Sequence, residues 1–257
     1  MILTRLDGAV GTITLNNEAK RNILSEPLVE QLIAALHMFA AEKVRCVVLR
    51  AQPGVKVWSA GHNVAELPES GADPLGWQDP LRKLVREIEN CPAPVIAMIE
   101  GSVWGGGCET VFACDIIVAA PDVTFAATPA RHGVPYNISG LLTFMNAATL
   151  HIAKEMLFTA QPLPAERLER MGVINHVVPS DELEAFTYAM AETIARNAPL
   201  SISVMKEQMR ILAGAHSMSP QGFERVQGLR RVVYNSADYT EGIRAFKEKR
   251  KPTFSGK

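Results

Sequence analysis

The sequence predicts an α/β fold in which a parallel sheet is followed by a helical region. Short apolar segments alternate with helical patterns along the first half of the chain, as in parallel strands joined by helical crossovers. Helical patterns dominate from residue 138 onward. The chain has 257 residues, of which 47% are hydrophobic and 21% charged. It can therefore bury a large core, and this composition excludes an intrinsically disordered protein.

The predicted N-terminal elements follow from side-chain alternation and from turn residues. Apolar and polar residues alternate over residues 2–6 and 9–15, on either side of Asp7-Gly8, which favours a β-hairpin. Ser25 precedes a proline-containing first turn and an apolar stripe, a pattern that predicts the start of a helix. One face of this helix collects the apolar residues Leu28, Leu32, Ala35, Leu36 and Phe39.

Strands and helices alternate through the middle of the chain. Buried strands are predicted at residues 44–50, 95–99 and 115–119, because each is a short run of mostly apolar side chains. Residues 51–80 contain several glycines and prolines and are predicted to be loop-rich, with a helix following over 81–89. This order implies a sheet whose strands run parallel after the opening hairpin.

The second half of the chain is predicted to be helical with short interruptions. Glycine and proline break the helical patterns near residues 163, 172 and 179. Helices are expected over 183–212 with a break near Pro199, over 223–234 and over 239–249. We therefore expect an α/β core in residues 1–195 and a helical C-terminal region in residues 196–257.

Charge and cysteine content exclude several classes of protein. The 26 Lys and Arg residues balance 27 Asp and Glu residues, which argues against nucleic-acid binding. No run approaches the ~20 apolar residues of a membrane span, and the polar N-terminus lacks the pattern of a secretory signal, so we expect a cytoplasmic protein. The four cysteines form no Cys-x-x-Cys pair, and no zinc-site spacing is present. Buried or free thiols are expected at Cys46, Cys91, Cys108 and Cys114.

Two glycine-containing segments are the candidates for chemistry. The first is residues 59–63, Ser-Ala-Gly-His-Asn, and the second is residues 100–109, which contain the triplet Gly105-Gly106-Gly107 and open a helix through Phe112. Glycines let backbone N–H groups approach a ligand, and a helix N-terminus adds unpaired donors, so these segments could stabilise an anion. A tight packing turn is the alternative explanation of the triplet. A dinucleotide fingerprint fails, because Thr110 stands at the third glycine position.

These segments, their order and their spacing resemble the crotonase (enoyl-CoA hydratase/isomerase) superfamily, and the resemblance covers nearly the whole chain. Further matching stretches are Thr128-Pro129 and residues 133–137, 225–234 and 246–252. The resemblance implies a crotonase (ClpP-like) spiral of ββα units followed by a helical C-terminal region used for trimerisation. It also implies a homo-oligomer, a trimer or a dimer of trimers, with an acyl-CoA thioester as substrate.

The resemblance assigns roles to backbone groups of both segments. The N–H groups of His62 and Gly106 are expected to hold the thioester oxygen as an enolate forms, since a fixed donor pair lowers the energy of a developing oxyanion. CoA is expected along Ala60, Gly61, His62, Asn63 and Val64. The His62 imidazole is expected to shape the acyl pocket, although a loop histidine facing water is the alternative.

The pattern of carboxylates predicts the reaction. Hydratases of the superfamily use two glutamates; one matches Glu109, but the second position holds Ala130. A single carboxylate does not suit the paired acid–base work of hydration, whereas decarboxylation needs an oxyanion hole and a way to orient the leaving carboxylate. Glu109 is then expected to be structural, as a carboxylate near a helix N-terminus.

Further residues are matched by the resemblance. Tyr136 is expected to orient the substrate carboxylate or to manage the later proton, with a packed loop tyrosine as the alternative. Thr128 is a second candidate contact for this carboxylate. Lys249 lies in a basic run and is expected to meet a CoA phosphate, unless the run is simply a solvated tail. Asn63 replaces the usual aspartate of the superfamily and can keep a loop-capping hydrogen bond.

The resemblance therefore implies an enzyme that decarboxylates methylmalonyl-CoA to propionyl-CoA and CO2 through a thioester enolate. No metal or separate cofactor is expected, because CoA is part of the substrate. One alternative is an enoyl-CoA hydratase or isomerase that uses Glu109. The other is a non-catalytic crotonase-fold protein that binds acyl-CoA or RNA as a scaffold, against which the neutral charge and the intact glycine segments argue.

Overall fold

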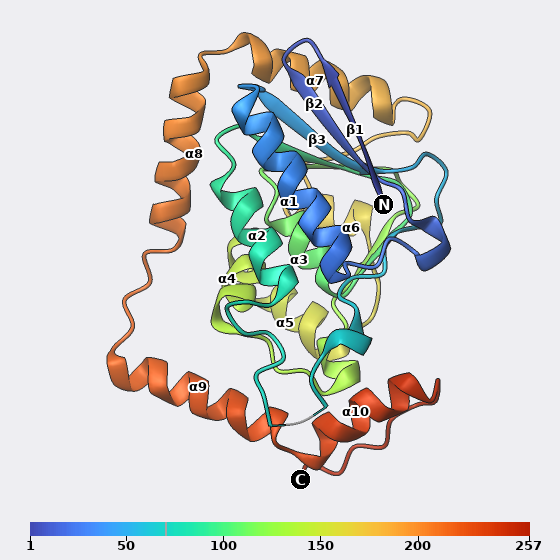
Figure 1. Ribbon diagram of the computed structural model, residues 1–257, viewed down its shortest axis with the longest axis vertical. Helices are drawn as coiled ribbons and strands as arrows, with labels where there is room; N and C mark the ends of the chain where they lie inside the picture. Colours follow the sequence, from blue (N-terminus) through green and yellow to red (C-terminus); the bar gives the residue numbers. More distant parts are fainter. Residues whose placement is uncertain (70) are drawn as a thin grey trace.

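The computed structural model describes residues 1–69 and 71–257. Its larger sheet has six strands in the order β1-β2-β3-β5-β7-β10, of which β1 and β2 form an antiparallel hairpin and the others run parallel to their neighbours (Figure 1). Its strands are β1 Ile2–Asp7, β2 Val10–Leu15, β3 Cys46–Ala51, β5 Val95–Ile99, β7 Ile116–Ala119 and β10 His176–Val177. The predicted hairpin, the three buried strands and the α/β class are therefore confirmed.

A second, smaller sheet carries the segments that reach the site. Its order is β4-β6-β8-β9, parallel except for the last pair. The strands are β4 Val57–Ser59, β6 Ser102–Trp104, β8 Thr124–Ala126 and β9 Leu163–Pro164. Each has only two or three residues, too few for a periodicity to show, which is why the sequence predicted a loop where β4 lies.

Helices cover both faces of the larger sheet. Gly11 faces α1 (Glu26–Ala41), where a Cβ on the glycine would lie 2.7 Å from the Phe39 ring. The next residue, Thr12, points to the other face, where its hydroxyl lies 2.8 Å from that of Tyr188 on α7 (Leu183–Arg196). All five apolar residues predicted for the α1 face are buried. Ser25 occupies the N-cap, but its side chain makes no capping hydrogen bond.

Further helices connect the strands and enclose the site. They are α2 Pro80–Asn90, α3 Gly106–Phe112, α4 Ile138–Ala147, α5 Leu150–Thr159 and α6 Ala165–Arg170. Short 3-10 turns lie at η1 Glu18–Lys20, η2 Val64–Glu66 and η3 Pro129–His132. The predicted helix over residues 81–89 and the predicted helix at the glycine triplet are confirmed as α2 and α3.

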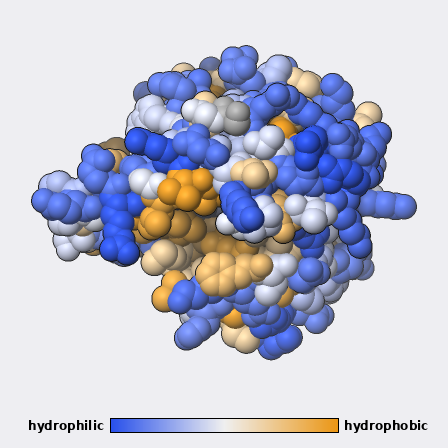
Figure 2. Space-filling view, turned by 90° about the horizontal axis from the view of Figure 1, so that it is seen from below, coloured by the Kyte–Doolittle hydropathy of each residue, from blue (hydrophilic) through white to orange (hydrophobic). Residues whose placement is uncertain are grey.

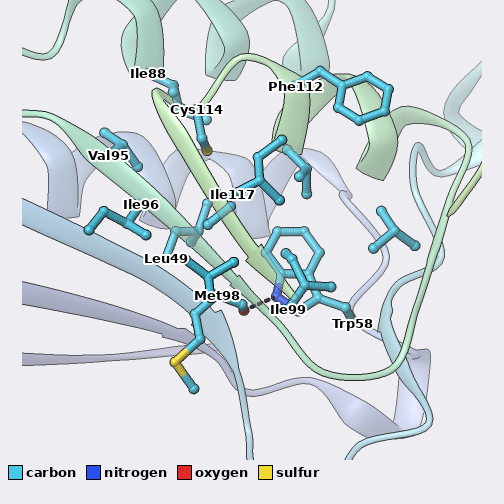
Figure 3. Packing of buried hydrophobic residues seen from close by; sticks show 14 of the residues in the cluster. Leu49, Trp58, Ile88, Val95, Ile96, Met98, Ile99, Phe112, Cys114 and Ile117 are labelled. Atoms are coloured by element: carbon cyan, nitrogen blue, oxygen red, sulfur yellow. Dashed lines mark hydrogen bonds between the residues drawn. The ribbon is translucent and has the colours of Figure 1, made fainter. Parts of the chain in front are cut away.

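The main core lies between the sheets and these helices. Trp58 on β4 is completely buried, and its indole N–H donates to the Met98 carbonyl on β5 at 3.1 Å (Figure 3). This bond ties the smaller sheet to the larger one, so that β4 ends at a fixed place. All four cysteines are buried, free thiols, as predicted, and burial raises the pKa of the Cys46 thiol to about 12.

The last three helices extend along the outside of the core and then return to it. They are α8 Pro199–Ala213, α9 Pro220–Tyr234 and α10 Ala237–Lys247, and Figure 1 shows α8 and α9 as an outer arm. The break predicted near Pro199 is confirmed. Lys206 holds α8 to the core: its buried ammonium lies 2.7 Å from Asp115 Oδ2 and also donates to the carbonyls of Ile88 and Ala93. Helix α10 contacts η2 and η3.

Candidate active site

A cavity of about 240 Å³ lies at the ends of β4 and β6 and along η3, and its walls include residues of α2 and α10. Its described walls are mostly apolar, with a few polar groups, as in small-molecule sites. They are formed by Arg21, Ile23, Ala60, His62, Val64, Leu67, Leu75, Leu81, Gly105, Gly106, Thr128, Pro129, His132, Val134, Tyr136 and Phe246. The cavity thus collects Ala60, His62, Val64, Gly106, Thr128 and Tyr136 from the residues predicted for the site.

Two backbone nitrogens, those of His62 and Gly106, lie close together at one wall of this cavity. Gly61 has a φ of +83°, and a Cβ on it would lie 2.3 Å from the Trp104 carbonyl oxygen and 2.7 Å from the Gly106 nitrogen. A Cβ on Gly106 would in turn lie 3.2 Å from the His62 nitrogen. Only glycine permits this approach. The two predicted donors are therefore neighbours.

Both of these N–H groups are available to a ligand. Gly106 is the first residue of α3, where a helix leaves its N–H groups without an intrahelical acceptor. Among the backbone hydrogen bonds that the described residues form outside helices and strands, none has the His62 or the Gly106 nitrogen as its donor. Such a donor pair can hold one negatively charged oxygen.

The imidazole of His62 is fixed by a carboxylate. Its Nε2 lies 2.7 Å from Asp79 Oδ2, and the two side chains are only 10% and 8% exposed. The pKa of His62 is raised: burial opposes the charged form, but the hydrogen bond and the charge of Asp79 outweigh it, helped by the Asn63 carbonyl and Glu66. Asp79 is also the N-cap of α2, because its Oδ1 accepts from the N–H groups of Leu81 and Arg82.

Glu109 is paired with Arg82 and does not line the described cavity. Its side chain is fully buried on α3, forms an ion pair with the Arg82 guanidinium, and is not part of the cavity wall. Its Oε2 has no hydrogen-bond partner among the described residues. Burial raises the pKa of Glu109 to about 7, and the charge and hydrogen bond of Arg82 oppose the rise. That Glu109 has a structural role stays a prediction.

Tyr136 lies between the cavity and Glu109. Burial, and then the charge of Glu109, raise the pKa of its hydroxyl well above 10, so the phenol keeps its proton and can act as a hydrogen-bond donor. Its ring packs edge-on against Phe144 at 5.6 Å between centroids. Behind it, Arg230 on α9 donates to the Tyr136 carbonyl at 3.1 Å.

The other predicted residues lie at the edges of this site. Asn63 caps η2: its Oδ1 accepts from the Ala65 N–H and its amide donates to Glu66, as expected for a loop cap. Thr128 precedes η3 and reaches Gly105. Ala130 is exposed on η3 and does not line the cavity. Lys249 is exposed just past α10, close in sequence to the cavity residue Phe246.

Sequence reasoning missed three residues that bond to site segments without lining the cavity: Asp79, Arg82 and Arg230. Asp79 carries one usable signal, an aspartate directly before Pro80, which predicts a helix N-cap. Its bond to His62, 17 residues away, and the bond of Arg230 to Tyr136, 94 residues away, depend on the tertiary fold.

Among the described residues, no group of three or more metal-ligating side chains comes together, and none of their helices is both long and apolar enough to span a membrane.

Comparison with known proteins agrees with this site. The family model for enoyl-CoA hydratase/isomerase matches residues 5–257. The chain belongs to this family. Among curated members, it is 49% identical over 247 residues to methylmalonyl-CoA decarboxylase of Escherichia coli, covering 96% of this chain and 95% of that protein. It is 31% identical over 259 residues to the human enoyl-CoA hydratase domain-containing protein 3, covering 98% and 82%.

Solved structures of the family give the same result. A methylmalonyl-CoA decarboxylase in complex with 2-nitronate-propionyl-CoA superimposes with a TM-score of 0.98 at 47% identity, covering 100% of this chain and 98% of that one. A second, in complex with 2S-carboxypropyl-CoA, gives 0.97 at 47% identity and the same coverage. An enoyl-CoA hydratase subunit of Geobacillus kaustophilus gives 0.75 at 30% identity, covering 100% and 98%. The crotonase fold expected from the sequence is therefore confirmed.

Proposed function

We propose that this protein decarboxylates methylmalonyl-CoA to propionyl-CoA and CO2. The observation that carries the proposal is the combination of a free backbone donor pair at His62 and Gly106 with a cavity whose described walls contain no carboxylate. The identity to a methylmalonyl-CoA decarboxylase over nearly the full chain supports it, as do the complexes of such enzymes with CoA thioester analogues.

The reaction begins with the thioester oxygen at the His62 and Gly106 N–H groups. The bond between the α-carbon and the carboxylate then breaks, CO2 leaves, and the electron pair passes into the thioester to form an enolate. The two N–H groups stabilise the enolate oxygen more than the ground-state carbonyl, which lowers the barrier. Losing one such donor typically costs about 2.7–4 kcal/mol. A proton added to the α-carbon completes propionyl-CoA.

Tyr136 and Thr128 are proposed to orient the departing carboxylate. Both residues line the same cavity, and a neutral hydroxyl donor can hold a carboxylate without adding a repelling charge. Cleavage requires this carboxylate to stand perpendicular to the thioester plane. The largely apolar walls contributed by Leu75, Leu81 and Val134 reduce its solvation, which favours the step to neutral CO2.

CoA is proposed to run along residues 60–64, with Lys249 near its phosphates. Arg21, a second cation, lines the cavity beside Ala60.

We further propose that the chain assembles as a trimer or a dimer of trimers. Helices α8 and α9 expose apolar side chains at Leu200, Val204, Met209, Leu212, Phe223, Leu229 and Val232, and Figure 2 shows apolar groups gathered on the face seen from below. Exposed patches of this kind are typical of protein interfaces.

The test is direct. The purified protein is incubated with methylmalonyl-CoA, and CO2 and propionyl-CoA are measured; we expect both in equal amounts. A folded protein that binds CoA thioesters but gives no turnover would contradict the proposal.

Hydration of crotonyl-CoA is the second candidate function, and the burial of Glu109 against Arg82 disfavours it. Loss of this hydration in Glu109→Gln, with retention in Tyr136→Phe, would favour a hydratase.

A further inference from the structure

The first turn of α2 touches both segments that supply the N–H groups of His62 and Gly106. Asp79 binds the imidazole of His62 at 2.7 Å, on the loop that carries one N–H group. Three residues later, Arg82 binds Glu109, on the helix that begins with the other N–H group at Gly106. Between these two contacts, Leu81 covers Gly106 so closely that a Cβ on the glycine would lie 2.7 Å from Leu81 Cδ2.

These contacts form a rigid unit. Both oxygens of Asp79 are engaged, since Oδ1 accepts from the Leu81 N–H at 3.0 Å and from the Arg82 N–H at 3.3 Å. The side chains of Arg82 and Glu109 are 5% and 0% exposed. In such a water-poor setting, charged hydrogen bonds hold their geometry strongly, and breaking one leaves a costly unpaired group.

We propose that this turn, residues 79–82, is a clamp that sets the separation of the two oxyanion-hole N–H groups, with Asp79 and Arg82 as positioning residues. Asp79 holds the His62 loop and Arg82 holds α3, while neither side chain lines the cavity. The donors therefore stay aligned as charge develops on the enolate oxygen. This inference rests on the proposed function, because it assigns the support of that same site.

Two substitutions separate position from charge. In Asp79→Asn, the amide oxygen can still accept from the Leu81 and Arg82 N–H groups, while the amide nitrogen can donate to His62 Nε2. The geometry is kept and the charge is lost. In Asp79→Ser, the hydroxyl is as good an N-cap as the carboxylate, but it is too short to reach His62. The helix is kept and the clamp is lost.

The experiment measures the oxyanion hole directly. Propionyl-CoA labelled with ¹³C at its thioester carbonyl is bound to each variant, and the infrared frequency of the carbonyl is recorded. We expect a shift to lower frequency on binding to the wild-type protein and to Asp79→Asn, and most of this shift to be lost in Asp79→Ser. In turnover of methylmalonyl-CoA, Asp79→Ser should lower kcat about ten- to a hundredfold, with KM changed less than about threefold.

Two further variants complete the test. Glu87→Ala on the same helix removes an exposed histidine–carboxylate bond of equal length, 2.7 Å to His37, and should change neither the carbonyl frequency nor kcat. His62→Ala keeps the backbone N–H but removes the clamp from its other end. We expect His62→Ala to lose as much of the carbonyl shift and of kcat as Asp79→Ser does. The double variant that carries both substitutions should show no further loss of either. His62→Ala carries the test if Asp79→Ser does not fold.

A wild-type carbonyl shift in both Asp79→Ser and His62→Ala would overturn the clamp. Equal loss in Asp79→Asn and Asp79→Ser would also overturn it, because charge rather than position would then be responsible. If the carbonyl shift is kept in the wild-type protein and Asp79→Asn and lost in Asp79→Ser, but the wild-type protein does not decarboxylate methylmalonyl-CoA, the proposed function fails while the clamp stands.

Discussion

Arg230 on α9 binds Asp73, in the loop before α2, through two nitrogens, although 157 residues separate them in the sequence. The Arg230 side chain is 6% exposed, and the same guanidinium also donates to the Tyr136 carbonyl. One buried cation thereby joins the C-terminal helices, the loop over the cavity and the segment that carries Tyr136.

Replacing Arg230 by Met should destabilise the protein and lower its activity. The change leaves the Asp73 carboxylate without its partner, a loss that typically costs about 3–5 kcal/mol for buried pairs; because Asp73 is 32% exposed, we expect the lower end of this range. Urea unfolding measures the effect. Arg210→Met removes an exposed pair with Glu207 and should cost less than about 1 kcal/mol. Similar losses in the two variants would argue against a special role for Arg230.

Glu109→Gln should leave decarboxylation within a few-fold of the wild-type rate. The amide oxygen can still accept from Arg82, and the side chain does not line the cavity. Tyr136→Phe removes the hydroxyl of a residue that lines the cavity and should lower kcat about 10²-fold, as for other positioned groups. Production of propionyl-CoA from methylmalonyl-CoA measures both. A Glu109→Gln variant without activity, but with an unchanged Tm, would require a catalytic role for Glu109.

Gly61→Ala should abolish activity and destabilise the fold. At this position φ is +83° and the added methyl would lie 2.3 Å from the Trp104 carbonyl oxygen, so the His62 N–H must move away from that of Gly106. Gly54→Ala is the matched control: φ is +76°, but the space around it is open, and only the backbone strain of about 1–2 kcal/mol is expected. Thermal unfolding and kcat distinguish the two, and equal behaviour would exclude steric crowding as the cause.

The pH dependence should reveal the environment of His62. Because Asp79 raises its pKa in the folded state, its bond contributes stability that is fully present below about 6.5, the unfolded value, and is lost as pH rises through the folded pKa. His132 has the opposite shift, since burial lowers its pKa. NMR titration should place His62 above and His132 below 6.5. Asp79→Asn should bring His62 below 6.5; an unmoved titration would show that Asp79 is not the cause.

The helices and long strands could be predicted because they satisfy a local pattern. Apolar spacing located the α1 face, the glycine pattern singled out two segments, and the family resemblance assigned the N–H groups of His62 and Gly106 within them. The strands of the smaller sheet were missed because β4, β6 and β8 have three residues each. Three residues carry no periodicity, and their strand form comes from pairing with distant segments.

The support of the site could not be predicted for a related reason. The sequence shows that Asp79 can cap a helix, but which imidazole it meets depends on how α2 crosses the end of β4. Likewise, Glu109 can be recognised as a lone carboxylate, but only the fold shows that it pairs with Arg82 and does not line the cavity. Charged groups that pair across the fold leave no spacing in the sequence.

The burial of Glu109 against Arg82 also affects hydrogen exchange at the α-carbon of the product, propionyl-CoA. The described cavity wall contains no carboxylate, and the unpartnered oxygen of Glu109 is buried behind it. With no carboxylate facing the acyl chain, a C–H bond made at the α-carbon is reopened less readily than in a site that presents one. In heavy water, each turnover should therefore place a single deuterium on propionyl-CoA, and prolonged incubation of the finished product should add no second one.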